Sequence, residues 1–344
     1  DVLGSRGLGD VYKRQVLSGV TGVALAYFGF SYWGLATQSI VYVFVTTACY
    51  WHFTRWRPTL QINFAPIKEM FGFSGKLLVT NVFNHINNNL FSVILGKFYS
   101  EQEVGYYSQA NKWCSMGQQF ISGMINGVAQ PVLTKVSDDL ERQRRVFRKM
   151  LRFTAFISFP AMLGLGIISE ELITITITDK WYSSVSIMQI LCISGAFIPV
   201  SNLYQQLIIS KGKSRIYMWN TITLGIILLA GVLLVHSHGI YAMLAIYVST
   251  NILWLLTWHY FVQREIGLQL RQALADILPY AIIAATVMAV SYYSTRFVEN
   301  IYIRLPSKIM LAAALYIAAM WASRSVTFKE SIAYFIKKKT DGHE

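Results

Sequence analysis

The segment 77–96 is largely apolar but carries a row of amide and imidazole side chains at helical spacing. Asn81, Asn84, His85 and Asn88 fall at i, i+3, i+4 and i+7, so they share one face of an α-helix. The chemistry that such side chains offer is hydrogen bonding, and when they are buried they need polar partners or water. This face is therefore expected to look into the interior of a helix bundle or into a hydrated cavity.

Two further segments repeat the pattern, one with Ser115, Gln119, Ser122, Asn126 and Gln130, the other with Asn202, Tyr204, Gln205 and Gln206. One explanation is that the amides join helices through interhelical hydrogen bonds. The other, favoured by three such stripes in one chain, is a shared aqueous cavity. We therefore expect a substrate-binding cavity that contains Asn81, Asn84, His85, Asn88, Gln119, Asn126, Gln130, Asn202 and Gln205.

Catalytic and metal-binding motifs do not emerge from the sequence. There is no Walker A loop, no G-x-S-x-G elbow and no HExxH pair, and the acidic residues lie mainly in loops. His85 is the only titratable group that we place in the middle of a membrane span, and no span contains an obvious Asp or Glu. His236 and His238 lack a third metal ligand. We expect no enzyme activity, no metal and no cofactor, and we expect Cys49, Cys114 and Cys192 to be buried thiols.

The elements that must position these amides follow from the distribution of charge. Only 14% of the 344 residues are charged, where a soluble domain carries about 25%. Residues 15–54 and the 48 residues 216–263 contain no Asp, Glu, Lys or Arg at all. About 20 apolar residues span a bilayer, and a charge at the centre of a span is costly. The sequence therefore predicts a polytopic membrane protein.

The uncharged runs predict about ten transmembrane helices and an all-α fold. The two longest runs each hold two helices, with turns at residues 30–34 and 236–239. In order, the runs are residues 15–54, 77–96, 113–134, 153–169 with an extension at 172–178, 181–210, 216–263, 277–295 and 309–323.

The loops between these spans differ in charge. One set, with the C-terminal tail, holds 21 Lys and Arg residues, whereas the other holds six, so the positive-inside rule places the first set and the C-terminus in the cytoplasm. The net charge of +13 thus reflects topology, and its division among separate loops argues against a nucleic-acid partner. Within the basic set, residues 135–152 are expected to form a solvated loop or, alternatively, an amphipathic helix at the lipid headgroups.

A set of short motifs in fixed order resembles the oligosaccharide flippases, the Wzx or polysaccharide-transporter branch of the multidrug/oligosaccharidyl-lipid/polysaccharide superfamily. The resemblance extends over about residues 16–325. The motifs are Phe71-Gly-Phe-Ser-Gly75, Ile94-Leu-Gly-Lys-Phe98, Val104-Gly-Tyr-Tyr-Ser-Gln-Ala110, Gln130-Pro-Val-Leu133, Ser137-Asp-Asp139, Phe159-Pro160, Asp179-Lys-Trp181 and Ser210-Lys-Gly-Lys213.

The resemblance implies a fourteen-helix, two-lobe fold of which this sequence supplies helices five to fourteen. We expect the sequence to lack the first four helices. The implied division is a leader outside the family at 1–15, a two-helix remnant of the N-terminal lobe at 16–54, a cytoplasmic linker at 55–76, a six-helix C-terminal lobe at 77–263, a terminal helix pair at 264–323 and a basic cytoplasmic tail at 324–344.

The function implied by the resemblance is the flipping of undecaprenyl-pyrophosphate-linked oligosaccharide across the bacterial inner membrane by alternating access, for export of surface polysaccharide such as O-antigen or capsule. Polysaccharide polymerase or ligase machinery would be a partner, and a proton or sodium gradient a source of energy. Lys76, Lys97, Lys112 and Arg152 are candidates for contact with the pyrophosphate. Many relatives carry an acidic residue where this chain has Phe91, which argues against carboxylate-based ion coupling at that position.

Three alternatives stay open, one of which is a membrane scaffold protein that transports nothing. An exporter of the same fold would carry a different substrate, either a peptidoglycan precursor or a cationic drug. A membrane enzyme of polysaccharide assembly would need a large loop with catalytic residues, whereas the loops expected on the non-cytoplasmic side are short.

Overall fold

A computed structural model describes residues 16, 18–25, 27–29, 31–53, 64–323, 328 and 330, and these residues contain helices and turns but no strand. The chain divides between Ile67 and Lys68 into two compact units. In the first unit, residues 18–25 are helical and are followed by α2 (Ser31–Phe53). The predicted leader 1–15 and most of the predicted tail 324–344 lie outside the described residues.

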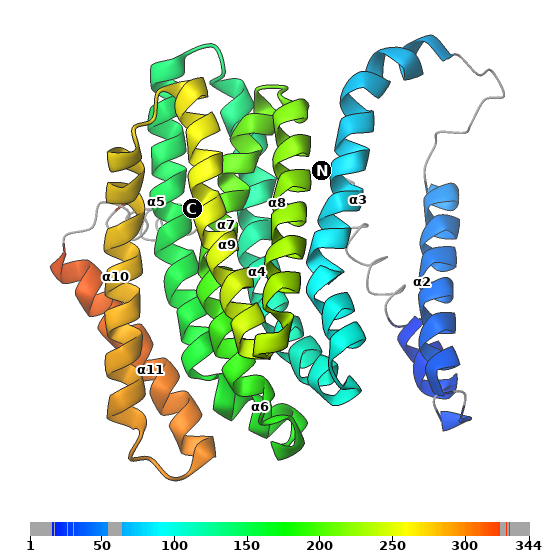
Figure 1. Ribbon diagram of the computed structural model, residues 1–344, viewed down its shortest axis with the longest axis vertical. Helices are drawn as coiled ribbons and strands as arrows, with labels where there is room; N and C mark the ends of the chain where they lie inside the picture. Colours follow the sequence, from blue (N-terminus) through cyan, green and yellow to red (C-terminus); the bar gives the residue numbers. More distant parts are fainter. Residues whose placement is uncertain are drawn as a thin grey trace, which may run out of the picture. The chain divides into compact units, whose positions relative to one another are not determined.

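The second unit contains long helices joined by short connections (Figure 1). The helix α3 (Phe64–Phe98) begins just before the boundary and runs into this unit, so the second half of the predicted linker 55–76 is helical. The second unit continues with α4 (Glu101–Lys135), α5 (Leu140–Ile167), α6 (Ser169–Ile177), η1 (Asp179–Trp181), α7 (Ser184–Ser210), α8 (Ser214–Val235), η2 (His236–His238) and α9 (Ile240–Ile266).

The last two described helices, α10 (Leu270–Thr295) and α11 (Ile301–Ala322), form an antiparallel pair that packs against α5 (Figure 1). The predicted turn at residues 236–239 is confirmed, because η2 and Gly239 separate α8 from α9. We call the end with connections 136–139, 211–213 and 267–269 the basic end, and the end with connections 99–100, 236–239 and 296–300 the opposite end.

Six of the described helices are long and apolar enough to cross a membrane: α5, α7, α8 together with η2, α9, α10 and α11. The helices α3 and α4 are each 35 residues long, but they carry two of the three polar stripes. The all-helical, multi-pass membrane fold predicted from charge spacing is thus confirmed.

Local sequence explains where α4 and α5 begin. Ser100 forms a capping box with Glu103 at the start of α4, and the Asp139 side chain accepts a hydrogen bond of 2.9 Å from the Arg142 amide at the start of α5. The solvated loop predicted at 135–152 is therefore wrong. From Leu140 on, this segment is an amphipathic helix, as the alternative predicted, and it forms the first half of α5, whose Phe147 and Leu151 are fully buried in the protein core.

Ionic clusters occupy both ends of α5 and correct the expectation that no span buries a carboxylate. Near the basic end, Asp276 of α10 is buried and pairs with Arg148 at 2.6 Å and with Arg152 at 3.1 Å. At the opposite end, Glu171 of α6 is buried against Lys308 of α11. These pairs fasten the α10–α11 pair to α5 and α6.

Two of the three cysteines are buried free thiols, as expected. The Sγ atoms of Cys114 on α4 and Cys192 on α7 lie 3.3 Å apart in the core between these helices. The side chain of Cys49 lies outside the described set.

Candidate substrate cavity

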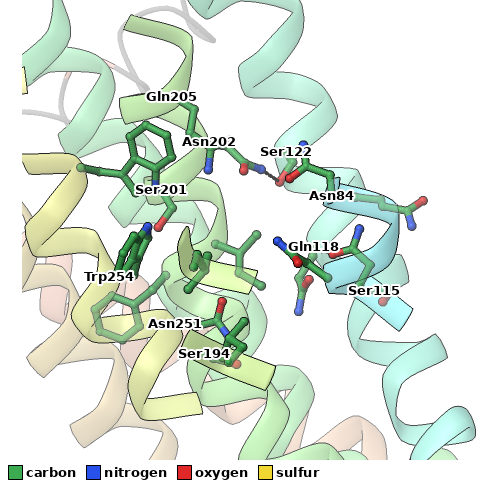
Figure 2. A pocket seen from close by; sticks show the side chains of 18 of the residues that line it. Asn84, Ser115, Gln118, Ser122, Ser194, Ser201, Asn202, Gln205, Asn251 and Trp254 are labelled. Carbon is green, nitrogen blue, oxygen red and sulfur yellow. Dashed lines mark hydrogen bonds between the residues drawn. The ribbon is translucent and has the colours of Figure 1, made fainter. Parts of the chain in front are cut away.

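A polar cavity of about 570 Å³ lies among α3, α4, α7, α8 and α9. Figure 2 shows Ser201, Asn251 and Trp254 on one side of this cavity, with Asn84, Ser115 and Gln118 on the other. Most of its lining residues carry amide or hydroxyl groups, and aromatic and aliphatic side chains complete the lining. The polar lining residues are Asn84, Asn87, Asn88, Asn89, Asn111, Ser115, Gln118, Gln119, Ser122, Asn126, Ser194, Ser201, Asn202, Gln205, Gln206 and Asn251.

The structure brings all three predicted stripes to this one cavity. Of the nine residues expected there, six line it, namely Asn84, Asn88, Gln119, Asn126, Asn202 and Gln205. Asn81, His85 and Gln130 do not line it and are exposed. The rotation of α3 explains why His85 is outside the cavity. Asn87 projects from the helix on the same side as Asn84 and Asn88 and lines the cavity where the prediction placed His85.

Several of the lining amides also join helices. Both explanations of the stripes, interhelical hydrogen bonding and a shared polar cavity, therefore apply. Asn84 donates to the Tyr217 hydroxyl at 3.1 Å, and Asn87 donates to the Thr221 carbonyl at 3.1 Å, which ties α3 to α8. Asn202 of α7 donates to Ser122 of α4 at 2.9 Å (Figure 2). Each of these bonds uses the amide nitrogen and leaves the side-chain oxygen of Asn84 or Asn202 available as an acceptor.

Other lining residues were not identified from the sequence. Asn251 is one amide in the apolar helix α9, and a single amide gives no periodic signal. Gln118 precedes Gln119, yet both line the cavity near the point where α4 faces α7. The aromatic lining residues, which a sequence cannot distinguish from ordinary core, are Phe197, Tyr217, Tyr247, Trp254 and Trp258.

The cavity is electrically neutral, since none of its described lining residues is Asp, Glu, Lys, Arg or His. The cations predicted to contact pyrophosphate, Lys76, Lys97, Lys112 and Arg152, are likewise absent from its lining. Arg152 is held by Asp276, and the Lys97 ammonium lies 5.7 Å from the centre of the Phe98 ring. A neutral ligand with many hydroxyl groups suits this lining better than an ion does.

Phe91 is completely buried. Its ring packs against Tyr107 at a centroid distance of 4.7 Å and against Tyr247 at 5.4 Å. Because Tyr247 lines the cavity, this aromatic cluster supports the wall of the cavity from behind.

Gly225 allows α3 and α8 to approach each other beside the cavity. A Cβ atom added there would lie 2.1 Å from the Asn87 Oδ1 atom and 2.9 Å from its Cγ atom. We expect Gly225→Ala to rotate Asn87 away from Thr221 and to lower the free energy of unfolding by about 1 kcal/mol, the typical net contribution of one hydrogen bond. Denaturant titration of the purified protein, followed by tryptophan fluorescence, measures this difference.

Gly123→Ala is the matched control, since a Cβ atom at this position of α4 would meet nothing within 4 Å. It should leave the protein as stable or stabilise it by up to about 1 kcal/mol, because alanine has the higher helix propensity. Equal effects of the two substitutions would contradict the close approach at Gly225.

The chain is similar to proteins of polysaccharide biosynthesis. A family model described as "Polysaccharide biosynthesis protein" matches residues 12–186, so the match starts within the predicted leader 1–15. The chain is 28% identical over 213 residues to the lipopolysaccharide biosynthesis protein WzxC of Escherichia coli, covering 60% of this chain and 42% of WzxC. It is 24% identical over 278 residues to the teichuronic acid biosynthesis protein TuaB of Bacillus subtilis, covering 78% of this chain and 57% of TuaB.

A third relative is a membrane protein from the cps region of Klebsiella pneumoniae, 27% identical over 292 residues, which cover 84% of this chain and 53% of that protein. This chain therefore spans about half the length of the curated relatives that it matches. Among solved structures, it resembles the lipid II flippase MurJ in its inward closed conformation, with a TM-score of 0.68 at 15% identity over 93% of this chain and 67% of MurJ. That likeness establishes the same helical fold.

Proposed function

Because the chain belongs to the family of polysaccharide biosynthesis proteins, we propose that it moves a lipid-linked oligosaccharide across the bacterial inner membrane. The proposed substrate is an undecaprenyl-pyrophosphate-linked repeat unit that passes from the cytoplasmic to the periplasmic leaflet by alternating access. The basic end and the C-terminus would face the cytoplasm, in accordance with the positive-inside rule.

The observation that carries this proposal is the neutral cavity of amides and aromatic rings. Sugar hydroxyl groups both donate and accept hydrogen bonds, and so do the amides of Asn88, Gln119 and Gln205. These three amides form no hydrogen bond within the part of the chain that the structure describes. The apolar faces of sugar rings can pack against Trp254 and Trp258, as ligands do in sites that combine apolar walls with a few polar groups.

The neutrality of the cavity also favours a glycan over a cationic drug as the substrate. A cationic drug buried in the cavity would be stabilised most by a carboxylate that offsets its lost hydration. No carboxylate is present among the described lining residues. We therefore favour a glycan, whose transfer needs no chemical step, with a proton or sodium gradient as the proposed source of energy and a polymerase or ligase as the proposed downstream partner.

Transport by reconstituted protein tests the proposal. The protein is placed in vesicles with either a fluorescent isoprenoid-linked glycan or a fluorescent cationic dye, and access to a membrane-impermeant quencher is followed in time. We expect movement of the glycan across the bilayer and none of the dye. Dye movement without glycan movement would refute the proposal in favour of a cation exporter.

A further inference from the structure

A second hollow, of about 360 Å³, lies between α8 and α9 and has walls of a different character. Ile216, Trp219 and Phe261 give it a mostly apolar surface, and Trp219 is 54% exposed. The groove starts near Arg215 in the first turn of α8 and reaches Thr223, eight residues and about 12 Å further along the helix. These features suit a flexible hydrocarbon chain that lies along the two helices.

Trp254 separates this groove from the polar cavity, because it lines both. Its indole nitrogen is buried and has no hydrogen-bond acceptor among the described residues. A buried indole N–H without a partner is uncommon, and the oxygen of a bound ligand would satisfy it. One side chain therefore stands between a space suited to sugars and a space suited to lipid.

Arg215 provides the groove with an available positive charge. It is exposed, and within the described part of the chain it forms no ion pair. Its neighbours at the basic end are engaged, since Lys213 pairs with Glu265 at 2.5 Å and Lys211 donates to the Ser137 carbonyl at 3.1 Å. An arginine with free N–H groups at the end of an apolar groove is complementary to a phosphate that carries a hydrocarbon chain.

The position of Arg215 also agrees with the position of the cavity. Tyr217, two residues further on, lines the cavity, so the two side chains leave α8 about 3 Å apart along its axis and in nearly opposite directions. A phosphate at Arg215 would thus lie level with the basic end of the cavity. The described cavity walls hold no cation to pair with the phosphate of a lipid-linked glycan, whereas Arg215 offers one in the groove.

We propose that the groove between α8 and α9 binds the isoprenoid chain of the lipid-linked glycan, with its phosphate at Arg215. This inference rests on the proposed function and assigns the lipid portion of that same substrate. The isoprenoid tail and the glycan would then contact opposite sides of Trp254. Binding of the tail in the groove would thereby affect the position of a side chain that lines the cavity. An ordinary anionic phospholipid is the competing occupant, and the following experiment separates the two.

Photocrosslinking in vesicles of phosphatidylethanolamine and phosphatidylglycerol tests the assignment. A diazirine-bearing undecaprenyl phosphate is activated beside the reconstituted protein, and labelled peptides are identified by mass spectrometry. We expect label on the α8 residues near Trp219 and the α9 residues near Phe261, in excess of the label from a diazirine-bearing phosphatidylglycerol. Arg215→Gln should lower the undecaprenyl label about five- to tenfold, as expected for the loss of one charge-assisted contact with a phosphate.

Two further variants sharpen the result. Arg271→Gln removes another exposed arginine near the basic end, outside the groove, and should leave the label unchanged. Thr257→Trp should block the groove and abolish the label, whereas Thr257→Ser should preserve it. Equal labelling by the phosphatidylglycerol probe, or labelling indifferent to Arg215→Gln, would overturn the assignment.

Glycan transport measured on the same preparations distinguishes the two proposals. Transport without label in the groove would overturn the lipid site and leave the proposed function standing. Label that depends on Arg215, without any transport of glycan, would uphold the lipid site and refute the proposed function.

Discussion

Simultaneous replacement of Asn84, Asn88 and Asn202 by leucine lowers glycan export about 100-fold, if the cavity binds the sugar. Each residue lines the cavity, and each would lose about 1 kcal/mol of hydrogen bonding to a sugar hydroxyl, so three losses amount to about two powers of ten. The measurement is surface polysaccharide in a strain whose own flippase gene is deleted and which expresses the reading frame that encodes this chain.

The matched control comes from the same stripes. Asn81, His85 and Gln130 are exposed polar residues on α3 and α4 that do not line the cavity, and their replacement by leucine should leave export within about twofold of the parent. Membrane-inserted amounts of both triple variants must match the parent for the comparison to hold. Equal export by the two variants would show that the amides only join helices.

The two sets of residues also show which features of the cavity can be predicted from the sequence. Amides that recur at helical spacing predicted the correct helices and six of the cavity residues, because the period of an α-helix fixes which side chains share a face. The period does not fix the rotation of the helix against its neighbours. Asn87 could be distinguished from His85 only by its contact with Thr221, which lies 134 residues further along the chain.

The ionic clusters are a second feature that the sequence does not predict. Asp276 lies just before the uncharged run 277–295, where the sequence predicts no buried carboxylate, whereas the structure buries it against Arg148 and Arg152, which are 128 and 124 residues away. A carboxylate can be buried there because two guanidinium groups replace its hydration. Arg152, predicted to contact a phosphate, is instead engaged with this carboxylate. Pairing over such separations leaves no local trace in a sequence.

The charge pattern likewise misplaced the start of α5. The start of the uncharged run 153–169 predicts a span that begins at residue 153, but the helix starts at Leu140, about three and a half turns earlier. The arginines of these turns are exposed or half-buried, while Phe147 and Leu151 fill the core, so a basic stretch forms one side of a helix whose other side is buried. Charge density alone could not separate these two faces.

The largest effect on stability is expected from Glu171→Leu at the opposite end. Lys308 is 2% exposed, and its ammonium lies 2.5 Å from the Glu171 carboxylate and 2.9 Å from the Ile167 carbonyl. Without Glu171 the charge of Lys308 is buried with no counter-ion, since Arg304 is a second cation beside the same carboxylate. Breaking a buried pair from one side costs about 3–5 kcal/mol. Unfolding by detergent titration, followed by circular dichroism, measures this loss.

Two variants show whether the loss arises from the unpaired charge. Glu170→Gln removes a partly exposed carboxylate that bonds Arg304 at 2.9 Å, and it should cost less than about 1 kcal/mol. The double variant Glu171→Leu with Lys308→Met removes both buried charges and should recover most of the stability, because apolar replacements of buried pairs are often neutral. A double variant as unstable as Glu171→Leu alone would contradict this explanation.

The double variant also separates stability from transport. The Glu171–Lys308 pair joins α6 to α11, and the second ionic cluster joins α5 to α10, so ion pairs hold the α10–α11 pair against α5 and α6 at both ends. If the Glu171–Lys308 pair serves only to fasten these helices, the stable double variant should export glycan at the parental rate. If export falls while stability returns, the charges themselves act in the transport cycle, for which a buried pair that opens and closes would be suited.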